Sequence, residues 1–251
     1  MASEEEKPSN ADRRATSHAG AFEGESRKAA GQPADNHIHT SIASRRRMVE
    51  SQLRARGIKD QSVLEAFLEI PRERFVPEDK AHEAYCDYPI PIGCGQTVSQ
   101  PYVVALMLEA LGPKPHHNVL DIGAGSGFQT ALLAKMVRHV YAIERIDTLA
   151  ERAMRVLSEM NVQNVSLCMN DGSLGWPEEA PFDGIICGAA APEVPPTWAN
   201  QLADGGRIVM PIGGHDVQTL TVIEKSGSKL TRSELCEVRF VKLIGRDGWP
   251  A

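Results

Sequence analysis

From about residue 99 onward, compact apolar runs alternate with longer segments of helical spacing. The apolar runs predict buried strands at 119–122, 140–143, 165–169, 182–187 and 207–211. Apolar residues at helical spacing predict helices at 102–111, 128–137, 147–160 and 196–202. Strands that alternate with helices pair in parallel, with helices on both faces of one sheet. The pattern therefore predicts an α/β fold with a mostly parallel central sheet.

The pattern changes toward the C-terminus. Strands are predicted there at 219–223, 230–238 and 240–244, without a convincing helix between the first two. Strands joined by a short turn pair antiparallel, whereas parallel pairing needs a longer crossover. We therefore expect the sheet to finish with an antiparallel C-terminal edge.

The first 40 residues have a different composition from the rest. They are rich in Ala, Ser, Gly and charged residues, and their only large apolar residues are Met1, Phe22 and Ile38. Such a segment buries too little surface to offset the entropy lost on ordering it. We therefore predict that residues 1–40 form a disordered tail.

The remainder, residues 41–251, is predicted to be a single domain. Its first part, 41–98, forms a cap of helices and loops, and its second part, 99–251, forms the α/β core. In the cap, helical spacing begins near Ile42 and ends at Gly57, because glycine commonly terminates helices. A second helical face ends before Pro71, and the chain up to residue 98 shows no further helical period.

Composition narrows the function classes. A net charge of −6 gives no basic surface signal for nucleic acid, and no apolar run is long enough to span a membrane. The five cysteines form no C-x-x-C pair, and their odd number argues against a disulfide framework or a structural zinc site. No apolar segment follows the charged N-terminus, so no secretory signal is expected. These features favour reduced thiols in a cytoplasmic setting, and no metal site is expected.

The clearest motif is VLDIGAGSG, an apolar strand that ends at Asp121 and enters a loop with Gly123, Gly125 and Gly127. The glycines allow a tight turn and a close approach of the backbone to a nucleotide. Two more acids, Glu144 and Asp171, follow the ends of the next two strands. Ligands of open α/β sheets bind at the carboxyl ends of the strands. Glu144 suits the two hydroxyls of a ribose and Asp171 an adenine amino group, so the set predicts a nucleoside site.

The spacing of the glycines helps to identify the nucleoside. The third glycine comes one residue earlier than in the dinucleotide fingerprint G-x-G-x-x-G, and the G-K-[ST] of a P-loop is missing. Asp121 beside the loop would repel a pyrophosphate but would suit a cationic ligand such as S-adenosylmethionine. The core therefore resembles the Rossmann-like fold of class I methyltransferases.

Two motifs of nucleic-acid methyltransferases are absent. The segment CGAAAPEVPP, residues 187–196, lacks the amide or acid before Pro-Pro and the aromatic residue after it that amino-methylating enzymes of this fold commonly carry. The chain also has no Pro-Cys nucleophile of the cytosine C5 enzymes. The loop after the fourth strand is therefore not typical of a platform for base stacking.

At this point the chain resembles protein-L-isoaspartate O-methyltransferases. The resemblance runs from about Met48 to Gly245 and is carried by GQTVSQP, VLDIGAGSGFQTALLA, VYAIERI, NDGSLGWPEEAPFDGIIC, GAAAPEVP, LADGGRIVMPIG and VRFVKLIG. It implies S-adenosyl-L-methionine as the cofactor and the carboxylate of L-isoaspartyl residues in damaged proteins as the methyl acceptor. It also implies repair, since the methyl ester cyclises to a succinimide that partly reopens as normal aspartate.

The resemblance implies that the loop GQTVSQP closes over the cofactor. Ser99 is expected beside the acceptor carboxylate, and Thr97 beside the cofactor or the acceptor. Ser99 is also expected to cap the following helix, with Pro101 in its first turn. The full set of expected cofactor-binding residues is Gln96, Thr97, Val98, Ser99, Asp121, Gly123, Gly125, Gly127, Glu144, Arg145, Asp171 and Gly172. A carboxylate is already ionised at neutral pH, so no general base is required.

Several alternatives stay open. The chain could methylate another small carboxylate or RNA, or it could be a nucleoside-binding module without catalysis. Intact Thr97 and Ser99 argue against the module, because a binding relic needs no acceptor loop. Lys242 stands where many relatives have proline, and Tyr102 where some have histidine, so peptide preference could differ. The expected partners are isoaspartyl proteins, without nucleic acid or membrane, and the chain is expected to be monomeric.

Overall fold

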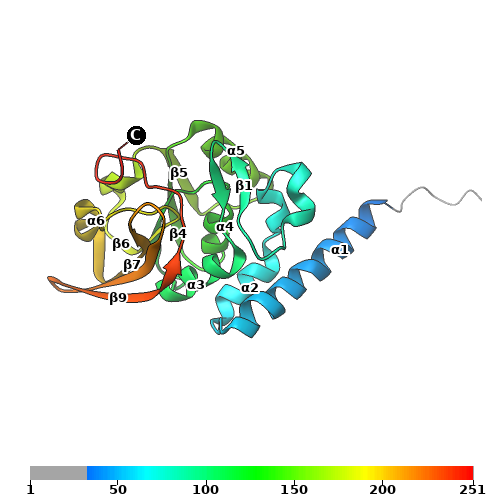
Figure 1. Cartoon of the computed structure of the whole chain (residues 1–251), viewed down its shortest axis with the longest axis horizontal. Helices are drawn as coiled ribbons and strands as arrows, with labels where there is room; N and C mark the ends of the chain where they lie inside the picture. Colours follow the sequence, from blue (N-terminus) through cyan, green and yellow to red (C-terminus); the bar gives the residue numbers. More distant parts are fainter. Residues whose placement is uncertain (1–32, 251) are drawn as a thin grey trace, which may run out of the picture.

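The computed structural model describes residues 33–250, so the predicted tail lies outside the described residues as far as residue 32. The core is a seven-stranded sheet of order β5-β4-β3-β6-β7-β8-β9 (Figure 1). Its strands are β3 (Asn118–Ile122), β4 (His139–Glu144), β5 (Val165–Met169), β6 (Phe182–Cys187), β7 (Leu202–Gly213), β8 (Gln218–Ser226) and β9 (Lys229–Val238). Strands β3 to β7 pair in parallel, and β8 and β9 pair antiparallel at one edge. Both predictions about the sheet are confirmed.

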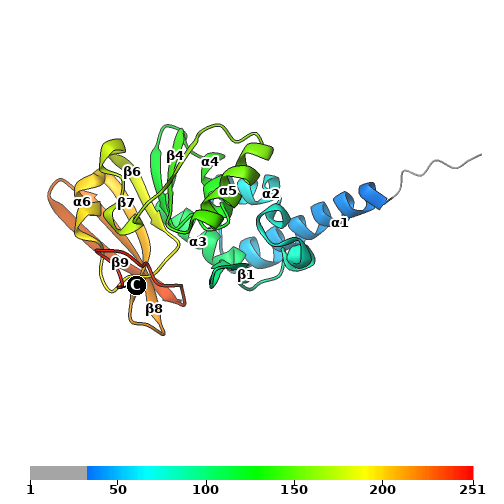
Figure 2. The ribbon, with the colours of Figure 1, turned by 90° about the horizontal axis from the view of Figure 1, so that it is seen from above.

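Helices and short turns cover the two faces of the sheet (Figure 2). The core helices are α3 (Pro101–Leu111), α4 (Phe128–Ala134), α5 (Asp147–Glu159) and α6 (Pro196–Gln201). Val119 and Ile186 pack with α3, α4 and α5, whereas their neighbours Leu120 and Ile185 pack with Trp198 of α6. Because successive side chains of a strand point to opposite faces, each apolar run is buried on both sides.

The cap precedes the core in the chain. It consists of α1 (Pro33–Met48), a π-helical turn (Val49–Leu53), a 3-10 turn (Arg54–Arg56), α2 (Gln61–Glu69), two further 3-10 segments (Arg72–Phe75 and Glu78–Glu83) and the hairpin of β1 (Ile90–Gly93) and β2 (Gln96–Val98). The first helical segment ends at Gly57, whose φ of 100° is left-handed, as predicted. It begins earlier than expected, however, within the segment assigned to the tail. Propagation costs less than nucleation, so a helix anchored from Ser41 onward extends back to Pro33.

The expected strand at 240–244 is wrong. This segment forms only isolated bridges, Ala190 with Lys242 and Ile244 with Trp249. The Ala190 amide donates to the Val241 carbonyl and the Leu243 amide donates to the Ala190 carbonyl. Leu243 of this run is buried and Lys242 is exposed, and the segment packs against the loop that follows β6. It therefore crosses the carboxyl ends of the strands instead of joining the sheet.

Three phenylalanine rings join the cap to the core. Phe67 of α2 and Phe75 of the following 3-10 segment lie 5.7 and 5.6 Å from the ring of Phe128, measured between ring centroids. All three side chains are buried, and they belong to one apolar cluster that includes both parts of the chain. This packing fixes the cap against the start of α4, which directly follows the glycine loop.

Candidate functional site

Two neighbouring pockets lie at the carboxyl ends of the parallel strands. One is bounded by the glycine loop, the end of β4 and residues 241–244, and it is called the nucleoside pocket below. The other has a volume of about 410 Å³ and lies between the polar loop 96–100 and residues 237–241; it is called the acceptor pocket below. Thr97 and Gly188 line both pockets, so these residues mark the place where the two meet.

Glu144 is the acid that faces the nucleoside pocket. Its Oε1 accepts hydrogen bonds from the amides of Arg145 (2.8 Å) and Ile146 (2.9 Å), and its Oε2 accepts one from the Gly125 amide (2.8 Å). A carboxylate has about four acceptor positions, so one remains for a ligand hydroxyl after these three amides. The amides hold the carboxylate in one orientation at the pocket wall.

The glycines of the loop have two different tasks. Gly123 and Gly125 line the nucleoside pocket, and Gly125 has a left-handed φ of 55° that lets its amide reach Glu144. Gly127 does not line the pocket. A Cβ at Gly127 would lie 3.1 Å from the Cβ of Ala153, so this glycine allows α4 and α5 to pack closely.

Asp121 lies behind the pocket wall instead of on it. Its side chain is fully buried, and its oxygens accept hydrogen bonds from Gln129 Nε2 (2.8 Å) and Thr130 Oγ1 (2.6 Å). Burial raises the pKa of this carboxyl to about 6, although the two hydrogen bonds oppose the shift. Gln129 in turn lines a narrow pocket together with Ser99, so the side chain that Asp121 holds is itself part of a pocket wall.

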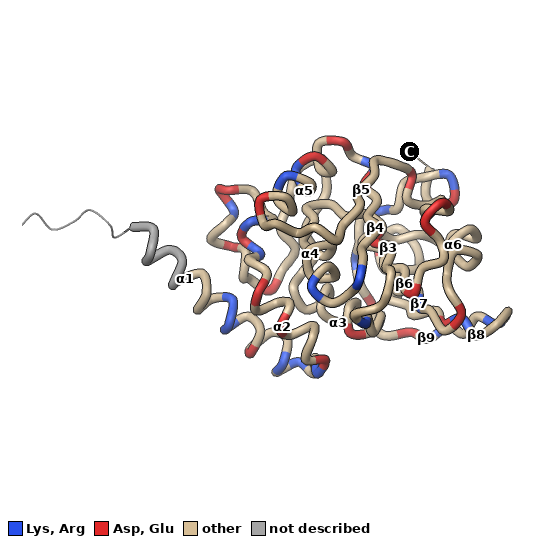
Figure 3. The backbone as a smooth tube through the Cα atoms, turned by 180° about the vertical axis from the view of Figure 1, so that it is seen from behind, with Lys and Arg blue, Asp and Glu red and all other residues tan. Residues whose placement is uncertain are grey.

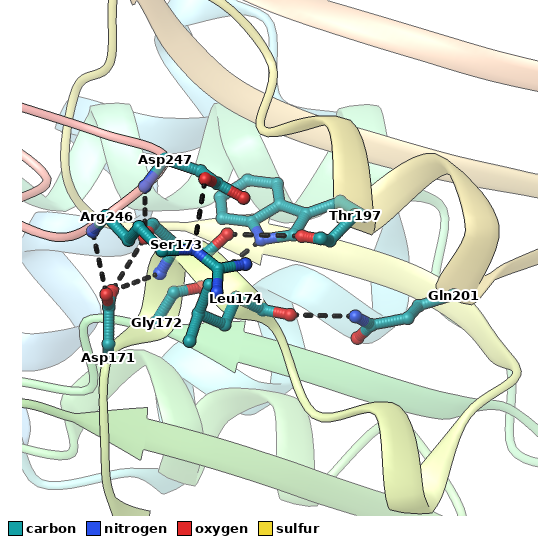
Figure 4. Close-up of polar contacts among 9 residues, drawn as sticks. Asp171, Gly172, Ser173, Leu174, Thr197, Gln201, Arg246 and Asp247 are labelled. Atoms are coloured by element: carbon teal, nitrogen blue, oxygen red, sulfur yellow. Dashed lines mark hydrogen bonds and ion pairs between the residues drawn. The ribbon is translucent and has the colours of Figure 1, made fainter.

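Asp171 is held by the C-terminal segment (Figure 4). Its Oδ1 accepts from the Ser173 amide (2.9 Å) and hydroxyl (2.7 Å), and its Oδ2 accepts from the Arg246 amide (2.8 Å). Burial alone would raise the pKa of this carboxyl, but the hydrogen bonds from Arg246 and Ser173 outweigh burial and hold it below its usual value. The neighbouring Gly172, and not Asp171 itself, lines the nucleoside pocket.

The polar loop brings Thr97 and Ser99 to the acceptor pocket. Val98 between them is buried and anchors the loop, while Gln96 and Arg145 line the nucleoside pocket. Ser99 is not the cap of α3, and this expectation is wrong. Because the helix begins at Pro101, the residue in the cap position is Gln100, whose side chain makes no capping hydrogen bond.

Sequence reasoning missed two groups of lining residues. Gly188 and Ala189 follow β6 directly, and residues 241–244 close the nucleoside pocket from the C-terminal side. A signal for Gly188 was present, because the carboxyl end of a fourth parallel strand belongs to the same edge. Residues 241–244 had no such signal, since their apolar pattern is equally typical of a strand.

Comparisons with known proteins show what the chain is similar to. The family model described as protein-L-isoaspartate(D-aspartate) O-methyltransferase (PCMT) matches residues 43–248. The chain is 48% identical over 205 residues to a protein-L-isoaspartate O-methyltransferase of Methanoregula boonei, covering 82% of this chain and 94% of that protein. It is 51% identical over 208 residues to protein-L-isoaspartate O-methyltransferase 2 of Marinobacter nauticus, covering 82% and 95%.

Solved structures are similar over most of the described residues. A Plasmodium falciparum structure, described as a protein-L-isoaspartate O-methyltransferase in complex with S-adenosyl-L-homocysteine, has a TM-score of 0.68 and 28% identity. That match covers 78% of this chain and 96% of the solved chain. Another structure described as a protein-L-isoaspartate O-methyltransferase has a TM-score of 0.69 and 30% identity, covering 78% of this chain and 65% of the other.

Proposed function

The chain belongs to the protein-L-isoaspartate(D-aspartate) O-methyltransferase family, and from this membership we propose how its residues carry out the reaction. The enzyme transfers a methyl group from S-adenosyl-L-methionine to the free carboxylate of L-isoaspartyl residues in damaged proteins and peptides. The methyl ester initiates repair through a succinimide. What remains to be assigned is the role of each residue at the two pockets.

The residues of the nucleoside pocket fit an adenosyl group. The observation that carries the proposal is the Glu144 carboxylate, which three backbone amides orient at the wall of a pocket next to Thr97. Its free acceptor position suits a ribose hydroxyl, and the glycine loop offers backbone without side chains. We assign Glu144, Gly123, Gly125, Arg145 and Gly172 to direct contacts with the cofactor.

The other expected cofactor residues are assigned to indirect or neighbouring roles. Asp121 and Gly127 shape the glycine loop from behind, and Asp171 holds the C-terminal segment against the pocket. Gln96 and Thr97 line the nucleoside pocket, and Val98 fixes their loop by burial. Apart from Gln96 and Thr97, each of these residues acts on the cofactor by setting the position of pocket backbone or of a neighbouring side chain.

Ser99 and Thr97 are proposed to orient the acceptor. S-adenosyl-L-methionine supplies, when bound, an electrophilic methyl group on a sulfonium. The acceptor carboxylate has a pKa near 4, so it is ionised at neutral pH and needs no base. The hydroxyls of Ser99 and Thr97 can donate to this carboxylate at the junction of the two pockets. The rate then comes mostly from alignment of the reactants and from exclusion of water.

We also propose that the enzyme is a cytoplasmic monomer that does not bind nucleic acid. Lys and Arg are interspersed with Asp and Glu over the described chain (Figure 3), and the net charge is −6. All five cysteines are free thiols, which suits a reducing compartment. Within residues 33–250, no helix has the length and apolarity needed to cross a membrane.

The test is methyl transfer from labelled S-adenosylmethionine to matched peptides that contain isoaspartate or normal aspartate at one position. We expect transfer to the isoaspartyl peptide alone. Equal transfer to both peptides, or none to either, would contradict the proposal, and cofactor binding without transfer would favour a non-catalytic binding module. A Ser99→Ala variant should keep its affinity for the cofactor and lose rate. Full activity of that variant would remove Ser99 from the orienting role.

A further inference from the structure

Arg72 is a buried cation without a counter-ion among the residues that the structure describes. It begins the 3-10 segment Arg72–Phe75 of the cap, and none of its surface is exposed. All ion pairs within residues 33–250 use other basic side chains. A buried guanidinium without a carboxylate partner lowers the stability of the fold, so a functional role for Arg72 is considered.

The guanidinium of Arg72 holds backbone from two loops. Its Nε donates to the carbonyl of Ala84 (2.8 Å), and its Nη2 donates to the carbonyl of Ser99 (2.8 Å). Its central carbon lies 4.8 Å from the ring centroid of Phe128. Nη1 is buried and has no hydrogen-bond partner within residues 33–250. Burial lowers the pKa of this group to about 9, which leaves it charged at neutral pH.

These contacts connect the two halves of the site. Ser99 lines the acceptor pocket, and Phe128 is the first residue of α4, directly after the glycine loop. Ser99 and Phe128 also line one narrow pocket together with Gln129. Ser99 is not the N-cap residue of α3. Its backbone is held instead by the hydrogen bond that Arg72 of the N-terminal cap donates to its carbonyl.

We propose that Arg72 is a positioning residue for methyl transfer, which fixes the Ser99 backbone relative to the start of α4 and so aims the Ser99 hydroxyl at the acceptor. The inference rests on the proposed role of Ser99. Arginine suits this task better than lysine, because its planar fork directs two donors along fixed lines, whereas an ammonium is a single point. In-line transfer depends on such alignment, and a misplacement of about 1 Å can cost about 10²-fold in rate.

The first experiment compares Arg72→Lys with a matched control, Arg45→Lys. Arg45 is another poorly exposed cation of the cap. It pairs with Glu73 and donates to the Tyr85 hydroxyl and to the carbonyls of Leu68 and Glu69, and it lines neither pocket. We expect Arg72→Lys to lower kcat for the isoaspartyl peptide by about tenfold or more. The dissociation constant of S-adenosyl-L-homocysteine should change less than about threefold, since Glu144 is held by other backbone. Arg45→Lys should lower the melting temperature and leave kcat unchanged.

A second comparison asks whether Arg72 acts through Ser99. If it does, Arg72→Lys should lower kcat much less in a Ser99→Ala background than in the wild type, because the hydroxyl it aims is already gone. Fully additive losses would overturn the proposal, as would equal effects of Arg72→Lys and Arg45→Lys on kcat. Wild-type transfer to the isoaspartyl peptide is measured first, so a failure of the proposed function is seen separately.

A further variant covers the case in which Arg72→Lys does not fold. Arg72→Gln removes the unpaired buried charge, so it loses less stability, yet it can reach only one of the two carbonyls. We expect this variant to bind S-adenosyl-L-homocysteine like the wild type and to show the same loss of kcat. Wild-type kcat in folded Arg72→Gln would show that Arg72 serves packing alone.

Discussion

Glu144, Asp121 and Asp171 stand at neighbouring strand ends, yet they differ in what surrounds them. Glu144 faces the nucleoside pocket, Asp121 is enclosed by Gln129 and Thr130, and Asp171 is bound by the C-terminal segment. The strand pattern predicts that the three acids share an edge of the sheet. It does not predict which way each carboxylate faces, because that depends on its hydrogen-bond partners, which are Gln129 and Thr130 for Asp121 and include the Arg246 amide for Asp171.

Substitution of Glu144 should weaken cofactor binding. In Glu144→Gln, an NH₂ group replaces one oxygen and faces a backbone amide of Gly125 or of Arg145 and Ile146. Hydrogen bonds to charged groups contribute about 1.5–3 kcal/mol, so we expect the dissociation constant of S-adenosyl-L-homocysteine to rise by about 10- to 100-fold in calorimetric titrations.

Glu109→Gln is the matched control for this substitution. Glu109 also accepts hydrogen bonds from two backbone amides, those of Lys59 and Asp60, but it lies in α3 and lines neither pocket. This variant should lose stability and keep its affinity for the ligand. Equal affinities of Glu144→Gln and the wild type would show that the ribose is bound elsewhere.

The buried Asp121 predicts a specific pH dependence of stability. Its pKa in the folded protein is raised to about 6 from 3.8, so between these values the folded state binds more protons than the unfolded state. The free energy of unfolding therefore falls as pH rises from about 4 to 6, and the loss is complete above that range. At 1.36 kcal/mol per unit, the loss is on the order of 3 kcal/mol.

Asp121→Asn should remove this dependence. The Thr130 hydroxyl can rotate to accept a hydrogen bond from the new amide, so the side chain keeps a partner. Urea unfolding at pH 4, 5, 6 and 7 should show the variant gaining stability relative to the wild type as pH rises. If the free energy of unfolding changed with pH equally in the two proteins, Asp121 would not be the source of the pH dependence.

At the scale of elements, the sequence pattern predicts most strands, and the reason is burial. Runs such as 119–122 and 182–187 are enclosed on both faces, so they are mostly apolar and stand out in the sequence. The segment 240–244 has a similar pattern but is buried against a loop instead of a strand. An apolar pattern reports burial and does not identify the partner, which is why this part of the nucleoside pocket was not predicted.

Gly245 tests whether the C-terminal segment supports the nucleoside pocket. A Cβ at this position would overlap Oδ1 of Asp171 and lie 2.6 Å from Oγ of Ser173, so in Gly245→Ala these side chains or the segment must move and their hydrogen bonds are disturbed. Leu243 and Ile244 just before it line the pocket. We expect a loss of about 1–3 kcal/mol in the free energy of unfolding and weaker binding of S-adenosyl-L-homocysteine.

Gly214→Ala is the control, because a Cβ there would meet no atom within 4 Å. It should change neither the melting temperature nor the affinity. If Gly245→Ala loses stability at unchanged affinity, the segment only packs against Asp171 and does not shape the pocket.

At the scale of the whole molecule, the contacts that build the acceptor loop come from distant parts of the chain. Arg72 of the cap bonds the carbonyl of Ser99, and Phe75 packs on Phe128. Local periodicity does not predict these two contacts, because it describes each residue relative to its neighbours in the sequence and not relative to a distant partner. The motifs therefore predict the site's location and its acids, while the joining of cap and core appears only in three dimensions.

The contacts between cap and core predict that the two parts unfold as one unit, as expected for a single domain. The apolar cluster includes Val63 and Phe67 of α2 together with Val119 of β3 and Ile186 of β6, so the cap cannot open without exposing core surface. A ligand at 100 times its dissociation constant adds about 2.7 kcal/mol to the free energy of unfolding. For amides that exchange only by global unfolding, this slows hydrogen exchange about 100-fold.

Hydrogen exchange with and without S-adenosyl-L-homocysteine measures this coupling. The slowest amides of α2 should be slowed by the same factor as those of β3 and β6, although α2 does not line the nucleoside pocket. In Glu144→Gln at the same ligand concentration, the slowing should shrink equally in cap and core, because it follows site occupancy. Protection that rises in β3 and β6 while the amides of α2 exchange as before would show that the cap opens independently. The Arg72–Ser99 contact would then break whenever the cap opens, with the cofactor still bound to the core.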